Sequence, residues 1–217
     1  MTAWLASPLR RSIDATLATS LLVVLSIPMV AVGLAVRIVH GKPVILRQTR
    51  SGRGGQPFVV HKFRSMTDER GPDGELLDDE RRLTPFGTWL RQSSLDELPQ
   101  LWNVVRGEKS LIGPRPLPAG YDTRYSAHQA RRLDALPGMS GWSQVSGRNE
   151  LSWPDKLDLD VWYVDNATWR IDVDILRRTV GTIVRRGGVN ALGHATAPEF
   201  LGDPVVAEDP RDTLTRS

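Results

Sequence analysis

The order of apolar and polar positions divides the chain into a long apolar segment and a series of shorter alternating and amphipathic ones. Residues 15–36 carry no charge and are mostly apolar, and as a helix they would match a bilayer core of about 30 Å. Pro28 has no backbone N–H and clashes with the preceding turn, and Ser26 offers a hydroxyl to the freed backbone groups. We therefore expect an N-terminal helix that is broken between Ser26 and Pro28.

The charges on both sides of this segment indicate how it would meet a membrane. Arg10 and Arg11 precede it, and further Lys and Arg residues lie within 37–53, so both flanks carry the cytoplasmic signature. This distribution favours a re-entrant helix that enters and leaves on one face. Hydropathy alone favours a plain transmembrane span, which stays open as the alternative. A cleaved signal peptide is disfavoured because the apolar segment is too long and lacks a small-x-small site.

The segment that follows has the pattern of a β-hairpin. Strand-like sequences at 44–46 and 58–66 flank a turn-like sequence at 51–55. A glycine-rich phosphate loop is disfavoured, because the Lys-Ser or Lys-Thr ending of a P-loop is missing. Period-two alternation places Lys62 and Arg64 on one face of the second strand. Two neighbouring cations either form a solvated face or bind an anion between them.

Helical patterns dominate the remainder of the chain. Residues 67–82 read as an exposed loop or short helix. A helix is predicted to start at Pro99 and to stop before Gly107. Residues 117–136 also look helical, with their arginines on an exposed face. An amphipathic helix is predicted at 171–186, where the arginines suit anionic lipid and the apolar side suits either a membrane interface or the core.

These elements together predict an α+β protein. A chain of 217 residues can bury one sizeable core. We therefore expect a single small catalytic domain at 41–190, preceded by the N-terminal membrane helix at 1–40 and followed by a tail at 191–217.

Composition and charge indicate the kind of binding partner but do not identify a single one. A formal net charge of +3 and a pI near 9.6 suit anionic partners, which include nucleotides, phospholipid headgroups and nucleic acid. The absence of cysteine removes disulfides and thiolate metal sites. The four histidines are scattered through the chain and form no short ligand pair, which disfavours a zinc or iron centre.

The densest candidate chemistry lies in the middle of the chain. Asp96 and Glu97 are adjacent carboxylates, with Arg91 before them and Arg115 after them. Two acids flanked by guanidinium groups suit a phosphate chemistry in which a cation takes the acids and the arginines take the phosphate. The spacing also fits a helix capping box from Ser94 to Glu97, which is a purely structural alternative.

A resemblance to a known family rests on four ordered motifs, KFRSM, SLDELPQLWNV, SLIGPRP and GWSQVSGRN. Together they resemble the bacterial sugar transferases, the monotopic phosphoglycosyl transferases, from about Arg11 to about Gly202. The tail sequence GHATAPEFLG resembles the small members that transfer acetamido-sugar phosphates. The resemblance implies transfer of a sugar 1-phosphate from a UDP-sugar to undecaprenyl phosphate, with release of UMP. This reaction would begin the membrane stage of surface polysaccharide or glycoprotein glycan assembly.

The resemblance also implies roles for individual residues. Asp96 would attack the sugar-bearing phosphorus and hold the sugar phosphate as an aspartyl ester, and an ordinary pKa of about 3.9 would keep it ionised at neutral pH. Glu97 would hold Mg²⁺, which prefers oxygen ligands. Arg91 and Arg115 would bind phosphate oxygens. The further candidates for binding substrate are Lys62, Arg64 and Arg148.

Two positions depart from the family pattern. The family has an adjacent Ser-Pro at its helix break, whereas Ile27 separates Ser26 from Pro28 here. A Met commonly precedes the Ser of the SLVGPRP-like motif, whereas Lys109 stands there in this chain. We interpret this lysine as surface variation.

The resemblance implies a protein of the bacterial inner membrane, with its catalytic domain on the cytoplasmic face. Its other partners would be membrane phospholipids, with no nucleic acid. Two other functions remain open. A noncatalytic basic adaptor at the membrane surface would have no need of the pair Asp96 and Glu97, and a hydrolase would use the same site with water as the acceptor.

Overall fold

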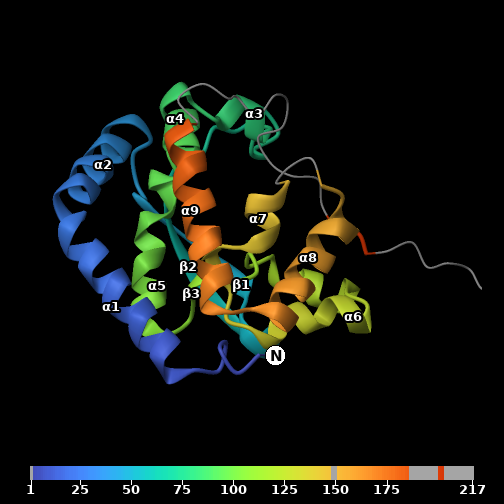
Figure 1. Ribbon diagram of the computed structural model, residues 1–217. Helices are drawn as coiled ribbons and strands as arrows, with labels where there is room; N and C mark the ends of the chain where they lie inside the picture. The colour runs from blue at the N-terminus through green and yellow to red at the C-terminus, as the bar shows by residue number, and fades with distance from the viewer. Residues whose placement is uncertain (1, 148–150, 186–199, 203–217) are drawn as a thin grey trace, which may run out of the picture.

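The computed structural model describes residues 2–147, 151–185 and 200–202. Helices and short strands are mixed along the chain, which confirms the predicted α+β class. The bent helices α1 and α2 form one flank of the molecule, and α6 and α8 lie on the opposite flank (Figure 1). The α-helices are α1 (Pro8–Val24), α2 (Ser26–Val39), α3 (Asp79–Arg82), α4 (Pro85–Gln92), α5 (Leu101–Arg106), α6 (Ala127–Ala130), α7 (Trp142–Ser146), α8 (Trp153–Asn166) and α9 (Trp169–Arg185).

Short 3₁₀-helices and two small sheets complete these elements. The 3₁₀-helices are η1 (Arg53–Gly55), η2 (Leu95–Gln100), η3 (Ala119–Arg124) and η4 (Arg131–Asp134), and the strands are β1 (Ile45–Ser51), β2 (Pro57–Phe63), β3 (Ser110–Ile112) and β4 (Gly138–Ser140). The predicted hairpin is confirmed, because β1 and β2 pair antiparallel around η1. In the second sheet, β3 and β4 pair in parallel, with Ser110 opposite Gly138 and Ile112 opposite Ser140.

The predicted kink in the N-terminal helix is also confirmed. The axes of α1 and α2 are bent by 64° at Leu25, one residue before the expected break. Pro28 cannot donate to the carbonyl four residues before it, and the Ser26 hydroxyl donates to the carbonyl of Val23 over 2.8 Å. Within the described residues, neither helix alone has the length and apolar character of a bilayer span, but the bent pair meets both criteria together.

The two far ends of the bent pair are fastened to the rest of the protein. On α1, Arg10, Asp14 and Ala18 are buried against α5 and β3. On α2, Val32 and Val36 pack in a cluster that includes Phe63 of β2 and Leu90 of α4. The large apolar side chains near and after the bend are exposed, namely Val23, Val24, Ile27, Val30, Leu34 and Ile38. The bend is therefore the part of the pair that faces away from the core.

The region 117–136 differs from the single exposed helix that its pattern predicts. It forms η3, α6 and η4, and a capping box between Ser126 and Gln129 starts α6. The prediction that its arginines are exposed is wrong for Arg132, which is buried. Its Nε and Nη2 donate to Oδ2 of Asp160 on α8, over 3.1 and 2.8 Å. A buried carboxylate partner explains how this charge is accommodated inside the protein.

The predicted amphipathic helix is confirmed as α9. Its inner face places Ile175 in a core cluster with Ile112 of β3 and Tyr163 of α8. Its outer face exposes Trp169, Val173, Leu176 and Val180. The inner face of α9 therefore packs against both β3 and α8, and its outer face forms an exposed apolar surface in addition to the one at the bend of α1 and α2.

Candidate active site

The carboxylate pair lies on η2, a 3₁₀-helix that interrupts the chain between α4 and α5. Ser94 adopts a left-handed conformation with φ of 58°, and its side chain makes no capping hydrogen bond, so the capping-box alternative is wrong. Pro99 lies inside η2, and the α-helical part begins at Leu101. The predicted stop before Gly107 is confirmed, because this glycine closes α5 with φ of 84°.

Glu97 is held by two cations that come from distant parts of the chain. Nζ of Lys62 on β2 donates to Oε1 of Glu97 over 2.7 Å, and Nη2 of Arg115, which follows β3, donates to the same oxygen over 3.2 Å. Burial alone would raise the pKa of the Glu97 carboxyl, but Arg115, Lys62 and Lys109 together hold this pKa well below its usual range. Glu97 is therefore a permanent carboxylate.

Asp96 has a different environment from its neighbour. It is only 7 % exposed, and within the described residues it makes no hydrogen bond or ion pair. Burial and the adjacent charge of Glu97 raise the pKa of the Asp96 carboxyl to about 6, against the opposing influence of Lys62, Arg91 and Arg115. The expectation of an ordinary pKa is thus wrong. The higher pKa makes Asp96 a stronger base, still mostly ionised at neutral pH.

Arg91 reaches the site from α4. The Thr84 hydroxyl caps this helix by accepting from the backbone of Gly87 over 2.9 Å. A Cβ at Gly87 would lie 1.8 Å from the carbonyl oxygen of Ser65, so only glycine allows this close approach. Nε of Arg91 donates to the Ser65 hydroxyl over 2.9 Å. Burial lowers the pKa of Arg91, while the negative charge of Asp96 acts to raise it, so the two side chains interact electrostatically.

Arg115 is positioned through its backbone. A Cβ at Gly113 would lie 2.3 Å from the carbonyl oxygen of Leu136, so glycine is needed where the segment after β3 crosses the one before β4. A Cβ at Gly138, the first residue of β4, would lie 2.1 Å from the backbone nitrogen of Gly113, so glycine is needed on both sides of this crossing. Nη2 of Arg132 donates to the carbonyl oxygen of Arg115 over 2.6 Å.

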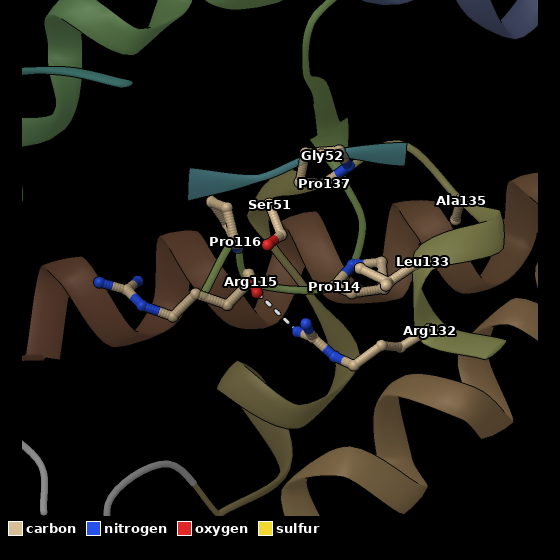
Figure 2. A pocket seen from close by; sticks show the side chains of 9 residues that line it. All are labelled: Ser51, Gly52, Pro114, Arg115, Pro116, Arg132, Leu133, Ala135 and Pro137. Atoms are coloured by element: carbon tan, nitrogen blue, oxygen red, sulfur yellow. Dashed lines mark hydrogen bonds between the residues drawn. The ribbon is translucent and has the colours of Figure 1, made fainter. Parts of the chain in front are cut away.

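A small cavity of about 10 Å³ lies beside this backbone, lined in part by Ser51, Pro114 and Arg132. Figure 2 shows the side chain of Arg115 extending away from it, while the dashed line marks the bond from Arg132 to the Arg115 carbonyl. The guanidinium of Arg115 therefore lies outside the cavity, where it pairs with Glu97. Arg132 therefore supports the backbone of Arg115, while its own carboxylate partner is Asp160 and not Asp96 or Glu97.

Lys109 is the site residue that sequence reasoning missed. The interpretation of surface variation is wrong, because this lysine is only 1 % exposed. Its Nζ donates to Oε1 of Gln100 at the end of η2, and its charge acts on Glu97. Burial lowers the pKa of Lys109 to about 7, against the influence of Glu97. A lysine two residues after a helix-ending glycine gives no hint in the sequence that it turns inward.

Two sequence candidates lie apart from this cluster. The guanidinium of Arg64 donates through Nε to the carbonyl of Met66 and through Nη1 to that of Lys42, each over 2.7 Å, and Nη2 pairs with Asp68. Arg64 therefore binds the chain on either side of the hairpin rather than the carboxylates. Arg148 lies outside the described residues.

The donor set fits a divalent cation that is shared with a substrate. Within the described residues, no group of three or more His, Asp or Glu side chains is close enough to hold a metal alone. Asp96 brings two unpaired oxygens, and Glu97 uses only Oε1 for its two cations. Mg²⁺ often takes one or two carboxylates and completes its octahedron with substrate phosphates and water. The two acids therefore suit Mg²⁺ in the presence of a phosphate ligand.

A carboxylate pair surrounded by Lys62, Arg91, Lys109 and Arg115 has the charge pattern that suits phosphate groups. Residues 5–186 match the family described as bacterial sugar transferase. The chain belongs to this family, which confirms the predicted membership and the prediction of a sugar-phosphate transferase enzyme.

Individual relatives agree with this placement. The chain is 46% identical over 199 residues to the uncharacterized sugar transferase EpsL of Bacillus subtilis, covering 92% of this chain and 98% of that protein. It is 39% identical over 198 residues to a UDP-galactose-lipid carrier transferase of Erwinia amylovora, covering 83% of this chain but only 41% of the relative. It is 38% identical over 189 residues to a UDP-glucose:undecaprenyl-phosphate glucose-1-phosphate transferase of Caulobacter vibrioides, covering 81% and 70%.

Proposed function

We propose that this protein transfers a sugar 1-phosphate from a UDP-sugar to undecaprenyl phosphate and releases UMP. The observation that carries the proposal is the pairing of two unlike carboxylates, a buried Asp96 without partners among the described residues and a Glu97 held by cations. The names of several relatives, which mention UDP-sugars or undecaprenyl phosphate, support the two substrates.

Asp96 is the nucleophile of this proposal. One of its oxygens attacks the sugar-bearing phosphorus of the UDP-sugar, and the bond from that phosphorus to the bridging oxygen breaks as UMP leaves. The sugar phosphate is then held as an aspartyl ester. An oxygen of undecaprenyl phosphate attacks the same phosphorus, and Asp96 leaves as a carboxylate. Its raised pKa, near 6, makes it basic enough to attack while it remains ionised at neutral pH.

The surrounding cations of the site bind and orient the diphosphate. Arg115 and Lys62 hold Glu97 in place and stay partly exposed, which leaves donors for phosphate oxygens, and the charge of Arg91 acts on Asp96. A planar guanidinium can bind two phosphate oxygens at once. Glu97 would hold Mg²⁺ together with substrate oxygens, and the ion would supply positive charge to offset the negative charge of the leaving UMP.

The N-terminal pair is proposed to enter the membrane and return on the same side. Its buried ends, Arg10 to Ala18 on α1 and Val32 to Val36 on α2, both pack on the domain that carries Asp96. A helix pair that is fastened at both ends to one domain cannot place those ends on opposite sides of a bilayer. The exposed apolar bend is therefore the part that lipid would cover.

This arrangement sets the location of the reaction. The catalytic domain would lie on the cytoplasmic face of the bacterial inner membrane, where UDP-sugars are available and undecaprenyl phosphate is held in the bilayer. The exposed apolar side of α9, with Arg177 and Arg178 nearby, would rest against phospholipid headgroups. The reaction would begin assembly of a surface polysaccharide or of a glycoprotein glycan.

The test is the release of UMP from a panel of UDP-sugars, with and without undecaprenyl phosphate and Mg²⁺. We expect one donor to give release that requires both additions and that is lost in Asp96→Asn. Release that requires Mg²⁺ but ignores the acceptor would indicate a hydrolase. Absence of release with every nucleotide sugar, from membrane-inserted and folded protein, would favour the noncatalytic adaptor.

The aspartyl ester has a test of its own. Incubation with the donor that gives release, in the absence of undecaprenyl phosphate, should add the mass of one sugar phosphate to the peptide containing Asp96. The matched control is Asp122→Asn, in which the Asp96 peptide should still gain this mass. Asp122 lies outside the carboxylate pair and accepts a hydrogen bond from the Ser51 hydroxyl. An unmodified Asp96 peptide under conditions of full turnover would contradict the covalent step.

A further inference from the structure

Three polar residues of α1 face the interior although this helix leads into the apolar bend. Arg10 is only 5 % exposed. Its Nη2 donates to the carbonyl oxygen of Ile112, the last residue of β3, over 2.6 Å, and to the Tyr163 hydroxyl over 3.2 Å. Its Nε donates to Oδ2 of Asp172 on α9 over 3.1 Å. The positive charge is thus paired, and one of its donors is used to hold a strand end.

Asp14 lies one turn further along the same face of α1. It is 7 % exposed, and its Oδ2 accepts from the Ser110 hydroxyl over 2.6 Å. Its Oδ1 accepts from the backbone N–H of Leu111 over 3.4 Å. Since Ser110 is the first residue of β3 and Ile112 the last, Asp14 and Arg10 hold this strand at both ends.

Arg11 fastens the element that precedes β3. Its Nη1 donates to the carbonyl oxygen of Val104 and its Nη2 to that of Val105, over 2.6 and 2.7 Å. These carbonyls belong to the last turn of α5, whose unsatisfied oxygens favour a cation. The chain that leaves η2 and runs to Arg115 is therefore attached to α1 at three successive points.

Two cations of the candidate active site flank the strand that these attachments hold. Lys109 directly precedes β3, and Arg115 follows it by three residues. Both cations act on Glu97, Arg115 through a 3.2 Å ion pair and Lys109 from its buried position. A shift of β3 along or away from α1 would move both relative to the carboxylate.

Packing alone does not require charges on this face of α1. A buried ion pair is weak evidence for stability, since apolar residues of similar volume often serve as well. Hydrogen bonds to a backbone carbonyl and to a backbone N–H, by contrast, fix the position of a strand along its own axis. The bonds from Arg10 and to Asp14 have this directional character.

We propose that Arg10 and Asp14 are positioning residues for the transfer reaction. They hold β3 against α1 so that Arg115 and Lys109 lie correctly around Glu97, which couples the seating of the N-terminal helix pair to the geometry of the phosphate site. This inference rests on the proposed function for its kinetic consequence. Its structural consequence, a β3 strand held in place by α1, stands independently of any substrate.

The structural consequence is tested by hydrogen exchange on the full-length protein in phospholipid nanodiscs. In the native protein, the amides of Ser110 and Gly113 are protected by bonds to the carbonyls of Pro137 and Ser140, over 2.9 and 2.8 Å. We expect Arg10→Met to speed their exchange about tenfold or more, with unchanged exchange in β1 and β2. The control Arg177→Met removes an exposed arginine from α9 and should leave β3 unchanged.

Ser110→Ala serves as the milder variant should Arg10→Met fail to fold. It removes only the hydroxyl that donates to Asp14 and keeps the backbone bond from Leu111. Faster exchange at Gly113 is expected here as well, at a smaller factor. Unchanged exchange of β3 in every folded variant would overturn the proposal, whatever the enzyme is found to catalyse.

The kinetic consequence is tested by a double-mutant cycle with Arg115→Met. We expect Arg10→Met to raise KM for the UDP-sugar about tenfold, and to have a clearly smaller effect in the Arg115→Met background, where only Lys109 is left to be positioned. Arg10→Lys, which keeps the charge near Asp172, should restore part of the loss. A purely structural role would lower the folded fraction and leave KM unchanged.

The outcomes separate the two proposals. Independent, multiplicative effects of Arg10→Met and Arg115→Met would show that Arg10 does not act through Arg115 and would overturn the positioning role. Faster β3 exchange, together with no transfer by the unmodified protein from any donor, would sink the proposed function while leaving the attachment of β3 to α1 intact.

Discussion

Lys62 on β2 and Glu97 on η2 are joined by a 2.7 Å ion pair, although they are far apart in the sequence. The same Oε1 of Glu97 also accepts from Arg115, so one carboxylate oxygen ties the hairpin, η2 and the segment after β3 together. Since both cations are only partly buried, each retains donors that a diphosphate can use. Under the proposed function, Glu97 would organise the phosphate site before any substrate arrives.

Lys62→Met should weaken the binding of the UDP-sugar. The substitution keeps much of the side-chain volume but removes a charge-assisted hydrogen bond worth about 1.5–3 kcal/mol. We expect KM for the donor to rise by about 10- to 100-fold, measured as UMP release at saturating undecaprenyl phosphate. Lys62→Arg, which keeps the charge, should lose much less. Equal losses in the two variants would show that shape, not charge, is needed at this position.

The raised pKa of Asp96 predicts an acid limb in the pH profile. A carboxyl with a pKa of about 6 is protonated below that pH and cannot attack phosphorus, so kcat/KM should fall tenfold per pH unit below about 6. Because a bound divalent cation favours the ionised form, the limb should move to lower pH as Mg²⁺ is raised. A profile that is flat down to pH 4 at low Mg²⁺ would contradict this prediction.

Lys109 predicts a second, alkaline limb. Burial lowers the pKa of this lysine to about 7, so its charge is present below that pH and is lost above it. As Lys109 becomes neutral, Glu97 loses one of its three cations and the phosphate site becomes less positive. We expect kcat/KM to decline above about pH 7, and Lys109→Met to lower the maximum and to remove the decline. An unchanged alkaline limb in that variant would assign it to another group.

Asp96→Asn should stabilise the protein while it abolishes transfer. The folded-state pKa is raised above the unfolded value, so this carboxyl favours folding below about pH 4 and that contribution is lost as pH rises through 6. An amide has no charge to bury. The free energy of unfolding of Asp96→Asn should therefore exceed that of the native protein by up to about 3 kcal/mol at pH 7.5, with no gain at pH 4.

Urea unfolding in detergent at the two pH values would measure this difference. The matched control is Asp122→Asn, another acid-to-amide change outside the carboxylate pair. Equal stability of native protein and Asp96→Asn at both pH values would show that burial of this carboxylate costs little.

Sequence patterns predicted the elements that depend on local chemistry. The hairpin, the helix stop at Gly107, the kink just before Pro28 and the amphipathic α9 each rest on residues within one short segment. The acids and arginines of the candidate site were proposed because two acids flanked by arginines suit phosphate chemistry and because they lie within motifs that resemble those of the family.

What the sequence concealed depends on contacts between distant residues. Lys109 is buried because its ammonium group donates to Gln100 and is stabilised by the negative charge of Glu97. Arg132 is buried because it pairs with Asp160, which a distant helix, α8, supplies. Arg10 looked like a topology signal on a membrane helix, yet its donors are taken by Ile112, Tyr163 and Asp172. The burial of a charged side chain is decided by partners that are brought together only by folding.

The re-entrant arrangement predicts which positions of the N-terminal pair a water-soluble thiol reagent can reach. The chain has no cysteine, so single cysteines can be introduced without further changes. Ala3→Cys and Lys42→Cys lie at exposed positions on the two flanks, and Ile27→Cys lies at the exposed bend. In sealed membrane vesicles of one orientation, we expect the two flanks to react from the same side and the bend to be protected.

Detergent provides the control for this labelling, because Ile27→Cys should become reactive once the bilayer is dissolved. A transmembrane span would label Ala3→Cys and Lys42→Cys from opposite sides. That result would also require α1 or α2 to leave the domain, since Arg10 and Asp14 hold one end of the pair and Val36 the other. Labelling of all three positions from one side would instead mean that the bend lies outside the lipid.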